Sequence, residues 1–379
     1  MKITGIICEY NPLHLGHKKQ LDALRTENPQ GGIVCLMSGN FVQRGMPAVF
    51  DKAVRAKAAV LAGADLVLEL PVISALSSAE GFAAGGVRIL SGFCDRLCFG
   101  AETADTDLLM RLAKALLSAD FSAALRLELD KGLSFPVARQ NALAAMGLDA
   151  SALELPNNIL AVEYCKAILA QTSPMLPYVI HREGAYHDTV ADQENPSATA
   201  LRQLIEAGEG WEAYVPDTDC FKGAAIHSLK HGEAAILYRL RTMTDAEFEA
   251  LPYGSEGLWR KLMHAARSKA TLEEIIAATK SKRYTRTRID RMIICAFLGI
   301  TAEILASPAP YVRVLALNEK GREILKKARQ NGSFINIGEA QDDPYQALED
   351  RCGALYGLLA SKTEEPDIES KYRIYYHRS

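Results

Sequence analysis

Two histidines three residues apart stand where the first helix of the chain is expected to begin. His14 and His17 lie in the segment NPLHLGH (residues 11–17), directly after an apolar run over residues 3–8 that predicts a buried strand. In an open parallel sheet, ligands bind at the carboxyl ends of the strands. A helix N-terminus there offers free N–H groups and positive dipole charge to a phosphate, and Gly16 lets the backbone come close to it. Two imidazoles add donors, or positive charge, where negative charge builds up during attack at phosphorus, so this position favours a nucleotide site over two ordinary loop histidines.

Polar residues and glycines also follow the later apolar runs. Because the carboxyl ends of parallel strands meet at one edge, these residues are expected to line the same site as the histidines. From the residue types alone, Gly100 could instead be a simple turn glycine and Arg182 could instead be a solvated surface arginine. The residues are Ser38, Gly39 and Asn40 after the second run, Gly100 after the fourth, and Arg182 after the run that ends at Ile180.

A helix start further along the chain carries hydroxyl groups. Ser197 and Thr199 stand at its beginning and Arg202 follows one turn later. Hydroxyls there can cap the helix and can also bind a triphosphate, so a plain N-cap is the alternative. Other polar residues have no clear assignment: Arg44 could meet phosphate, acetate, RNA or a surface carboxylate, and the role of Arg55 stays open.

The elements that must position these residues alternate along the chain. Apolar runs separated by helical patterns predict an α/β fold with a doubly wound parallel sheet. Near-continuous apolar strands are what a sheet covered on both faces requires. The predicted strands cover residues 3–8, 33–37, 65–70, 96–99 and 175–180, and the first predicted helices cover residues 17–28, 51–62 and 75–90.

Two stretches are helical without alternating strands. A helical insertion is predicted at about residues 105–155, and most of the chain from residue 197 to about 297 has a helical pattern. A boundary near Gly208 would therefore divide the chain into a catalytic α/β domain, residues 1–208, and a mainly helical C-terminal domain, residues 209–379. Within the second part, residues 311–317 are compatible with a strand.

The composition is that of a soluble globular protein. The chain has 379 residues, of which 49% are apolar and 23% are charged, and its length suggests two or three domains. A net charge of -3 excludes a general polyanion binder, so a nucleic-acid surface must be a local patch. The first apolar run is too short for a secretory signal, and no run is long enough for a membrane span. A cytoplasmic location is expected.

The cysteines and the remaining histidines predict no metal site. The eight cysteines are scattered without a CxxC pair, which is typical of reduced and mostly buried thiols. His227 and His231 have the spacing of ligands on one helix face, but neither a HExxH pattern nor a third ligand accompanies them. They are expected on an exposed helical face.

A basic segment lies between Arg260 and Arg291. It holds ten Lys or Arg residues against three acids, a local charge of +7 within a chain of net charge -3. Tyr284 is interleaved, and a basic patch with an aromatic suits RNA phosphates and stacked bases. A solvated helix face with ion pairs is the alternative, which the small number of acids disfavours. The residues expected to contact tRNA are Lys280, Lys282, Arg283, Tyr284, Arg286, Arg288 and Arg291.

The combined motifs resemble a known family. The segment EYNPLHLGH (residues 9–17) is similar to the HxGH signature of the HIGH superfamily of nucleotidyltransferases. More narrowly, the sequence resembles the tRNA(Met) cytidine acetate ligase family over roughly residues 1 to 300. The further blocks that carry this resemblance, in order, are MSGNFVQRG (37–45), GADLVLELP (63–71), CFGAE (98–102), PNNIL (156–160), SATALR (197–202) and KRYTRTRIDR (282–291).

The resemblance implies an ATP-dependent, AMP-forming ligase with two steps. Acetate would attack ATP to give acetyl-adenylate, and the wobble cytidine of elongator tRNA(Met) would then take the acetyl group as N4-acetylcytidine. Mg²⁺ is expected with the triphosphate. The alternative is a nucleotidyltransferase that adenylylates or cytidylylates a phosphorylated metabolite. The resemblance makes His14 and His17 catalytic and implies that ATP is bound by Ile7, Cys8, Glu9, Tyr10, Asn11, Pro12, Leu13, His14, Leu15, Gly16, His17, Lys18, Lys19, Gln20, Gly100, Asn157 or Asn158, Arg182, Ser197, Thr199 and Arg202.

Overall fold

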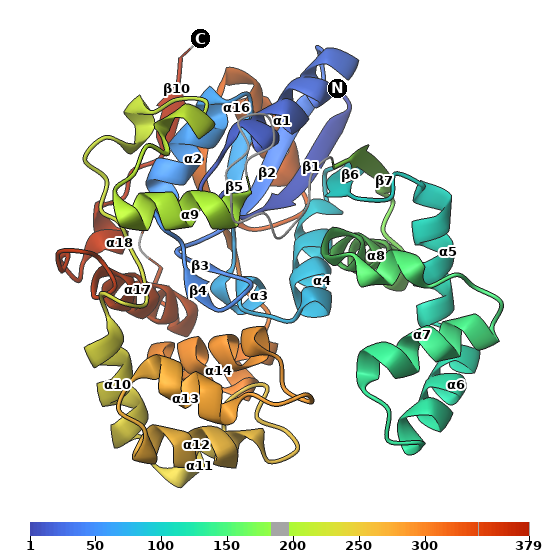
Figure 1. The fold of residues 1–379 in the computed structure, drawn as a ribbon. Helices are drawn as coiled ribbons and strands as arrows, with labels where there is room; N and C mark the ends of the chain where they lie inside the picture. Colours follow the sequence, from blue (N-terminus) through green and yellow to red (C-terminus); the bar gives the residue numbers. More distant parts are fainter. Residues whose placement is uncertain (183–196, 340, 379) are drawn as a thin grey trace.

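The fold is built around one mostly parallel sheet (Figure 1). The structure is a computed structural model that describes residues 1–182, 197–339 and 341–378. The strand order is β10-β8-β5-β2-β1-β6-β7, with β9 beside β8. The predicted α/β class is confirmed, and the five parallel strands are β1 (Ile3–Cys8), β2 (Gly32–Ser38), β5 (Leu66–Leu70), β6 (Arg96–Ala101) and β7 (Leu176–His181).

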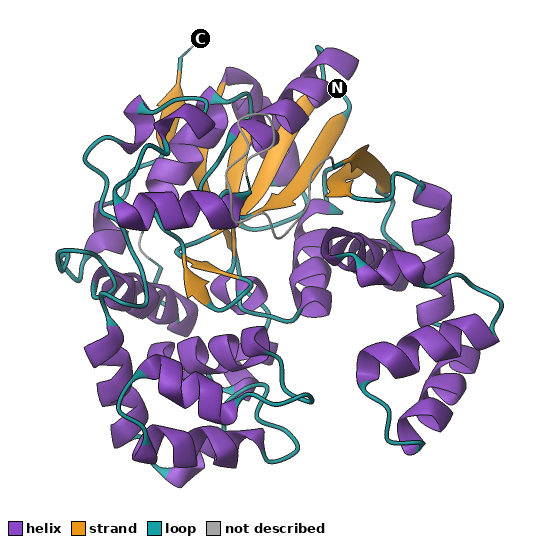
Figure 2. Ribbon diagram, in the orientation of Figure 1, coloured by secondary structure: helices purple, strands orange, loops and turns teal. Residues whose placement is uncertain are grey.

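The parallel strands form because both of their faces are buried. Alternate residues of β2 pack in opposite directions: Val34 and Leu36 into one apolar cluster, Cys35 and Met37 into another. Helices cover each face (Figure 2), which is the arrangement that continuous apolar strands require. On one face lie α1 (Leu15–Glu27) and α2 (Lys52–Leu61); on the other lie α4 (Ala79–Leu90), α8 (Pro156–Ala170) and α16 (Glu319–Ala328).

The order of the strands fixes where a ligand can bind. From β1 the chain moves to β2 and β5 on one side, and then to β6 and β7 on the other. The carboxyl ends of β1 and β6 therefore flank the point where the strand order reverses, which is the preferred ligand position in an open α/β sheet. The loops after β1, β6 and β7 carry the histidines, Glu102 and Arg182 to this point.

A helical segment stands between β6 and α8. It consists of α5 (Thr106–Leu116), α6 (Ala119–Asp130), α7 (Phe135–Ala145) and the short 3-10 helix η1 (Ser151–Glu154). These helices fill the span in which the helical insertion is predicted. In Figure 1, α6 and α7 project away from the sheet on the side of α8.

The chain from α9 to α15 is helical. A module with its own apolar core, which includes Phe248, Leu262 and Ile293, lies below the carboxyl ends of the central strands in Figure 1. The elements are α9 (Ala198–Ala207), η2 (Glu212–Tyr214), η3 (Asp219–Phe221), α10 (Glu233–Thr242), α11 (Asp245–Glu249), α12 (Leu258–Ser268), α13 (Leu272–Thr279), α14 (Arg286–Leu298) and α15 (Ala302–Ala306).

The chain then returns to the sheet. Strand β8 (Val312–Asn318) lies antiparallel to β5, and β9 (Phe334–Asn336) and β10 (Tyr375–His377) pair with β8. Helices α17 (Pro344–Gly357) and α18 (Ile368–Lys371) stand between these last strands. A division at residue 208 stays a prediction, but it does not follow the sheet, because the apolar run at residues 311–317 forms a buried strand of the same sheet as β1.

Several smaller expectations can be compared with the structure. All eight cysteines are free, and seven are buried. No helix in the described part of the chain has both the length and the hydropathy to cross a bilayer.

His227 is not on an exposed helix face: it is buried, its Nε2 lies 2.9 Å from Oε2 of Glu364, and its ring stacks on Tyr356. The i, i+4 spacing misled here because residues 222–232 form turns and irregular backbone rather than a helix, with an isolated β-bridge between His227 and Ala360.

Candidate active site

The two motif histidines are held by the start of α1. His14 is the N-cap residue: the N–H of Gly16 donates to its Nδ1 at 3.1 Å, and its own N–H donates to Nδ1 of His17 at 3.3 Å. This is a capping box in which two imidazoles replace the usual hydroxyl and carboxylate. The rings stack with their centroids 3.8 Å apart. The helix start thus fixes the position of one ring relative to the other.

The capping hydrogen bonds also define the tautomer of both histidines. Each Nδ1 accepts an N–H, so in the neutral imidazole the proton is on Nε2. Burial, followed by the charges of Arg182 and Arg202, lowers the pKa of His14 to about 3. Burial, followed by His14 and Arg182, holds the pKa of His17 well below its usual value. Both rings are therefore neutral Nε2–H donors at physiological pH, and that of His14 is buried without a hydrogen-bond partner among the described residues.

The start of α9 joins the loop that carries the histidines. Oγ of Ser197 accepts the N–H of Ala200 at 3.1 Å, which is the predicted N-cap. Arg202 donates to Oγ1 of Thr199 at 3.1 Å and to the carbonyl oxygen of Asn11 at 2.9 Å. These contacts bring a guanidinium from a distant part of the sequence to the first turn of the site, as the predicted convergence requires.

A carboxylate that the sequence analysis did not single out organises the opposite side of the site. Glu102, directly after β6, accepts the N–H of Asn158 at 2.9 Å and both the N–H and Nδ2 of Asn157, the latter at 2.7 Å. It therefore caps the N-terminus of α8. Arg182 donates to Oδ1 of Asn157 at 3.5 Å. No local pattern marks this cap, since Glu102 and the helix that it caps are about 55 residues apart.

The two asparagines of the PNNIL block have different surroundings. Asn158 is fully buried, and its amide group accepts from the N–H of Thr103 and donates to Oγ1 of the same residue, both at 2.9 Å. Asn157 is half-buried beside Arg182. Gly100 pairs with Ile180 inside the β6–β7 ladder, so it lies in the strand and not after it.

The other residues of the predicted ATP segment divide into core and surface. Ile7, Tyr10 and Leu13 are buried in the apolar clusters beneath the loop. Lys18 pairs with Asp22 on the exposed part of α1. Gln20 donates to Sγ of Cys98 at 3.4 Å.

Arg55 has a structural role. Its guanidinium is completely buried and donates to the carbonyl oxygens of Phe50, Glu9, Ser38 and Gly39. Three of these carbonyls, those of Glu9, Ser38 and Gly39, come from the ends of β1 and β2, where the backbone leaves the ladder and its acceptors need new donors; that of Phe50 lies just before α2. Arg55 therefore fixes the shape of the two loops that border the site.

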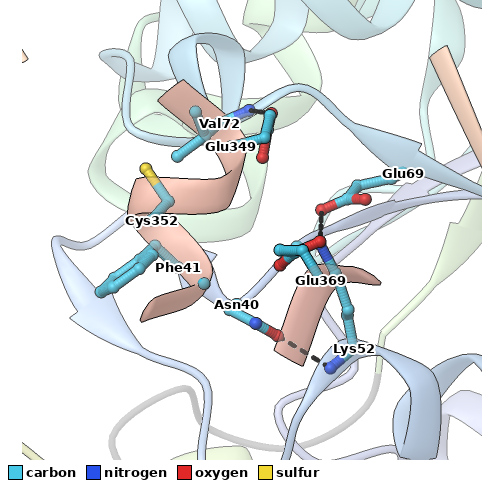
Figure 3. A pocket seen from close by; sticks show the side chains of 10 residues that line it. Asn40, Phe41, Lys52, Glu69, Val72, Glu349, Cys352 and Glu369 are labelled. Atoms are coloured by element: carbon cyan, nitrogen blue, oxygen red, sulfur yellow. Dashed lines mark hydrogen bonds and ion pairs between the residues drawn. The ribbon is translucent and has the colours of Figure 1, made fainter. Parts of the chain in front are cut away.

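A buried group of ion pairs occupies the carboxyl ends of β2 and β5 (Figure 3). Lys52 lies 3.0 Å from Glu69 and 2.7 Å from Glu369, and Arg313 bonds to Glu69, Glu349 and Glu369 at 2.8 to 2.9 Å. Burial raises the pKa of Glu369, which suits three carboxylates that share two cations. The remaining cavity of about 10 Å³ is barely enough to admit one water molecule. Glu69 thus joins the C-terminal part of the chain to the sheet.

The predicted tRNA residues do not form one exposed row. Lys280, Lys282, Arg283 and Arg286 are exposed around the α13–α14 connection. Arg283 pairs with Glu256 at 2.8 Å, and Arg286 pairs with Glu273 at 2.6 Å. Acids therefore pair with part of this segment, contrary to the expectation: Glu273 lies between Arg260 and Arg291, and Glu256 lies just before this stretch.

Two of these residues are buried. The ring of Tyr284 packs in the core of the helical module, and its OH donates to the carbonyl oxygen of Glu256 at 2.8 Å. Arg291 lies over the ring of Tyr253 and donates to the carbonyl oxygen of Gln43 at 3.4 Å. Arg288 is half-buried and donates to the carbonyl oxygen of Tyr253 at 2.8 Å. Tyr284 in this position cannot stack on a base, because its ring is needed by the apolar core.

Comparison with known proteins gives consistent matches over most of the chain or nearly all of it. A family model described as HIGH Nucleotidyl Transferase matches residues 1–371. A protein named tRNA(Met) cytidine acetate ligase from Clostridium perfringens is 37% identical, with 99% of this chain and 98% of the relative covered. A protein of the same name from Clostridium novyi is 38% identical over 88% of this chain and 89% of its own length.

Solved structures agree in fold. The crystal structure of Thermotoga maritima TmcAL, apo form I, has a TM-score of 0.90 at 31% identity, with 100% of both chains covered. A second structure of that protein, bound with alpha-thio ATP, has a TM-score of 0.88 at 30% identity over 100% of both chains.

Proposed function

Because the chain belongs to the HIGH nucleotidyl transferase family and, within it, to the tRNA(Met) cytidine acetate ligases, we propose that it is an ATP-dependent ligase that acetylates a tRNA cytidine. Acetate is activated as acetyl-adenylate, and the acetyl group passes to the exocyclic amine of the wobble cytidine of elongator tRNA(Met). The observation that carries the proposal is the convergence of two neutral Nε2–H imidazoles with Arg182 and Arg202 where the strand order reverses.

In the first half-reaction, a carboxylate oxygen of acetate attacks the α-phosphorus of ATP. The new P–O bond forms acetyl-adenylate while the bond to the bridging oxygen breaks and pyrophosphate leaves. The step needs positioning and charge stabilisation rather than a covalent nucleophile. His14 and His17 supply Nε2–H donors toward the charge that develops, and being neutral they do so without giving up a proton. Arg182 and Arg202 supply the fixed positive charge.

In the second half-reaction, the exocyclic nitrogen of cytidine attacks the acetyl carbonyl carbon. The bond between this carbon and the phosphate oxygen breaks, AMP leaves, and the nitrogen loses one proton. Mg²⁺ is proposed to enter with the triphosphate. Among the described residues no group of three or more His, Cys, Asp or Glu side chains could hold a metal, so its ligands would be phosphate oxygens and water, and no step is assigned to it.

The relatives favour the ligase over the nucleotidyltransferase alternative. Proteins named tRNA(Met) cytidine acetate ligase are 37% and 38% identical over 99% and 88% of this chain. This similarity over most of the chain supports a reaction with acetate and tRNA rather than adenylylation or cytidylylation of a phosphorylated metabolite.

The proposal is tested with purified protein and labelled pyrophosphate. Exchange of pyrophosphate into ATP should require acetate, and butyrate, a larger carboxylate of the same charge, should serve as the control that gives little exchange. Elongator tRNA(Met) added with acetate and ATP should gain N4-acetylcytidine, detected by nucleoside mass spectrometry. Exchange that proceeds without any acid, or only with a phosphorylated metabolite, would establish the nucleotidyltransferase instead.

A further inference from the structure

A hairpin between the sheet and the helical module holds an arginine whose role the sequence leaves open. The hairpin consists of β3 (Phe41–Val42) and β4 (Met46–Pro47), and its tip is Gln43-Arg44-Gly45. We propose that Arg44 binds the phosphodiester next to the target cytidine and so acts in acetyl transfer rather than in ATP activation. This inference rests on the proposed function, because it assigns a residue to its second half-reaction.

The tip has a fixed position because both of its neighbours are bonded. The N–H of Gln43 donates to Oε1 of Glu9, in the loop that leads to the histidines, at 2.9 Å. On the other side Gly45, at a φ of +74°, lies directly against α14, where an added Cβ would collide with the backbone nitrogen of Arg291. Arg291 also donates to the carbonyl oxygen of Gln43. Arg44 is thus held between the histidine loop and the helix that carries the basic segment.

The charge of Arg44 lies within reach of the site. Burial lowers the pKa of the Arg202 guanidinium; the carboxylate of Glu9 opposes this, and the positive charge of Arg44 adds to it. Arg202 contacts the loop carbonyl of Asn11, and Gln43, the neighbour of Arg44, bonds to Glu9 in the loop that leads to the histidines; Arg44 therefore lies near the histidine loop. Its side chain is half-buried, which is compatible with a surface that meets a large substrate.

The sheet order leaves one side of the site for the second substrate. Some of the proposed ATP residues lie in the loop after β1 and at the start of α9. The others belong to β6, to α8 or to the end of β7, which lie on one side of β1. The hairpin follows β2, on the other side, and the ion pairs close the region beyond it. In Figure 1 the hairpin lies between the sheet and the helical module. RNA held by the module would therefore reach the acetyl group past the hairpin tip. A guanidinium there fits a phosphodiester, because its N–H groups can bond to two phosphate oxygens at once.

The test separates the two half-reactions in Arg44→Ala and Arg44→Lys. Acetate-dependent pyrophosphate exchange should fall by no more than about threefold in both variants. Acetyl transfer to tRNA should fall by about 30-fold in Arg44→Ala, mostly through a higher KM for tRNA, and Arg44→Lys should recover part of it. The slope of log affinity for tRNA against log salt should become less steep by about 0.7 in Arg44→Ala, since one counterion-releasing contact is lost.

Arg322→Ala is the matched control. Arg322 is an exposed arginine of α16, a helix that begins beside Asp65 at the amino end of β5, the opposite edge of the sheet. It should change neither the salt slope nor acetyl transfer. Equal loss of exchange and transfer in Arg44→Ala would assign Arg44 to ATP or acetate, and transfer near wild type would leave it a surface residue; either result overturns the inference. If the wild-type protein itself gave no acetate-dependent exchange, the proposed function would fail first.

Discussion

Residue types predict the arrangement at the sheet edge around His14 better than the arrangement in the helical module around α14. At the sheet edge, residues from positions 14, 17, 102, 157, 182 and 202 come together. In the module, a run with a charge of +7 is divided among exposed cations, ion pairs and two buried side chains. The first region is organised by strand ends and the second by the surface that each helix exposes.

The difference has a physical origin. Residues after parallel strands must meet at one edge whatever the loops do, so the topology alone brings them together. A helix instead turns its residues through all directions, and a count of charges does not say which face is buried. Arg291 and Tyr284 illustrate this, because both are polar by type and yet serve the packing of the module.

The largest expected effect tests the sheet edge. His14→Ala and His17→Ala should each lower acetate-dependent pyrophosphate exchange by at least ~100-fold, the scale of a lost transition-state donor. His14→Gln is the matched variant, because its amide N–H₂ can still donate, and it should retain more exchange than His14→Ala. Near-unchanged exchange in both alanine variants, with melting temperatures like that of the wild type, would contradict the assignment of the site.

A smaller effect is expected for the two arginines of the same edge. Arg202→Ala and Arg182→Ala should weaken ATP binding by about 10- to 30-fold, the range of a charge-assisted hydrogen bond to a buried anion. Isothermal titration calorimetry with ATP measures this directly. Arg55→Ala serves as the contrast: its guanidinium bonds only to backbone carbonyls, so it should lower the melting temperature more than the other two. An unchanged ATP dissociation constant in Arg182→Ala would make that residue structural.

The fold and part of the candidate site could be predicted from the sequence because their signals lie in short, local segments. The apolar runs at residues 3–8 and 33–37 specify buried parallel strands, and Ser197 specifies a helix start, because these signals are local. Glu102 and the Lys52–Arg313 ion pairs could not be found in this way, since their partners lie 55 or more residues away in most cases. One signal was available: an arginine inside the apolar run YVRVLAL needs buried acceptors, and carboxylates are the usual ones inside a sheet protein.

The third prediction returns to the helical module. Lys282→Glu combined with Arg283→Glu should reduce acetyl transfer to tRNA by about tenfold and leave pyrophosphate exchange within about twofold of wild type, since both residues are exposed and far in sequence from the histidines. Lys326→Glu with Arg322→Glu on α16 makes the same change of charge at the opposite edge of the sheet and should affect neither reaction. Equal losses of exchange and transfer in the first double variant would show that the segment supports the fold instead of binding RNA.

The smallest expected effect is that of pH on pyrophosphate exchange. Its size distinguishes a buried imidazole that stays neutral from one that takes up a proton in this pH range. For a histidine with a pKa near 6.5, the fraction of molecules with a neutral ring would fall about tenfold between pH 7.5 and pH 5.5. Since the pKa of His14 is lowered to about 3 and that of His17 is also well below its usual value, exchange should vary by less than about twofold over this range, in which acetate stays ionised. Exchange rates with saturating acetate and ATP, measured at half-unit intervals, give the profile. A tenfold loss centred near pH 6.5 that vanished in His14→Gln would contradict the neutral assignment.

Stability should respond where activity does not. The unfolded chain binds a proton on His14 near pH 6.5, whereas the folded chain resists it until about pH 3. The stabilising contribution of the neutral ring is therefore complete above about pH 6.5 and is lost progressively as the pH falls toward 3, by up to ~1.4 kcal/mol per pH unit. Urea unfolding at pH 7 and pH 5 should show a smaller loss for His14→Gln than for the wild type, by about 1–2 kcal/mol, because glutamine does not titrate. If the wild type and His14→Gln lost the same unfolding free energy between pH 7 and pH 5, His14 would have the same pKa in the folded and unfolded chain. A buried, neutral Nε2–H donor could then no longer explain a flat pH profile of exchange.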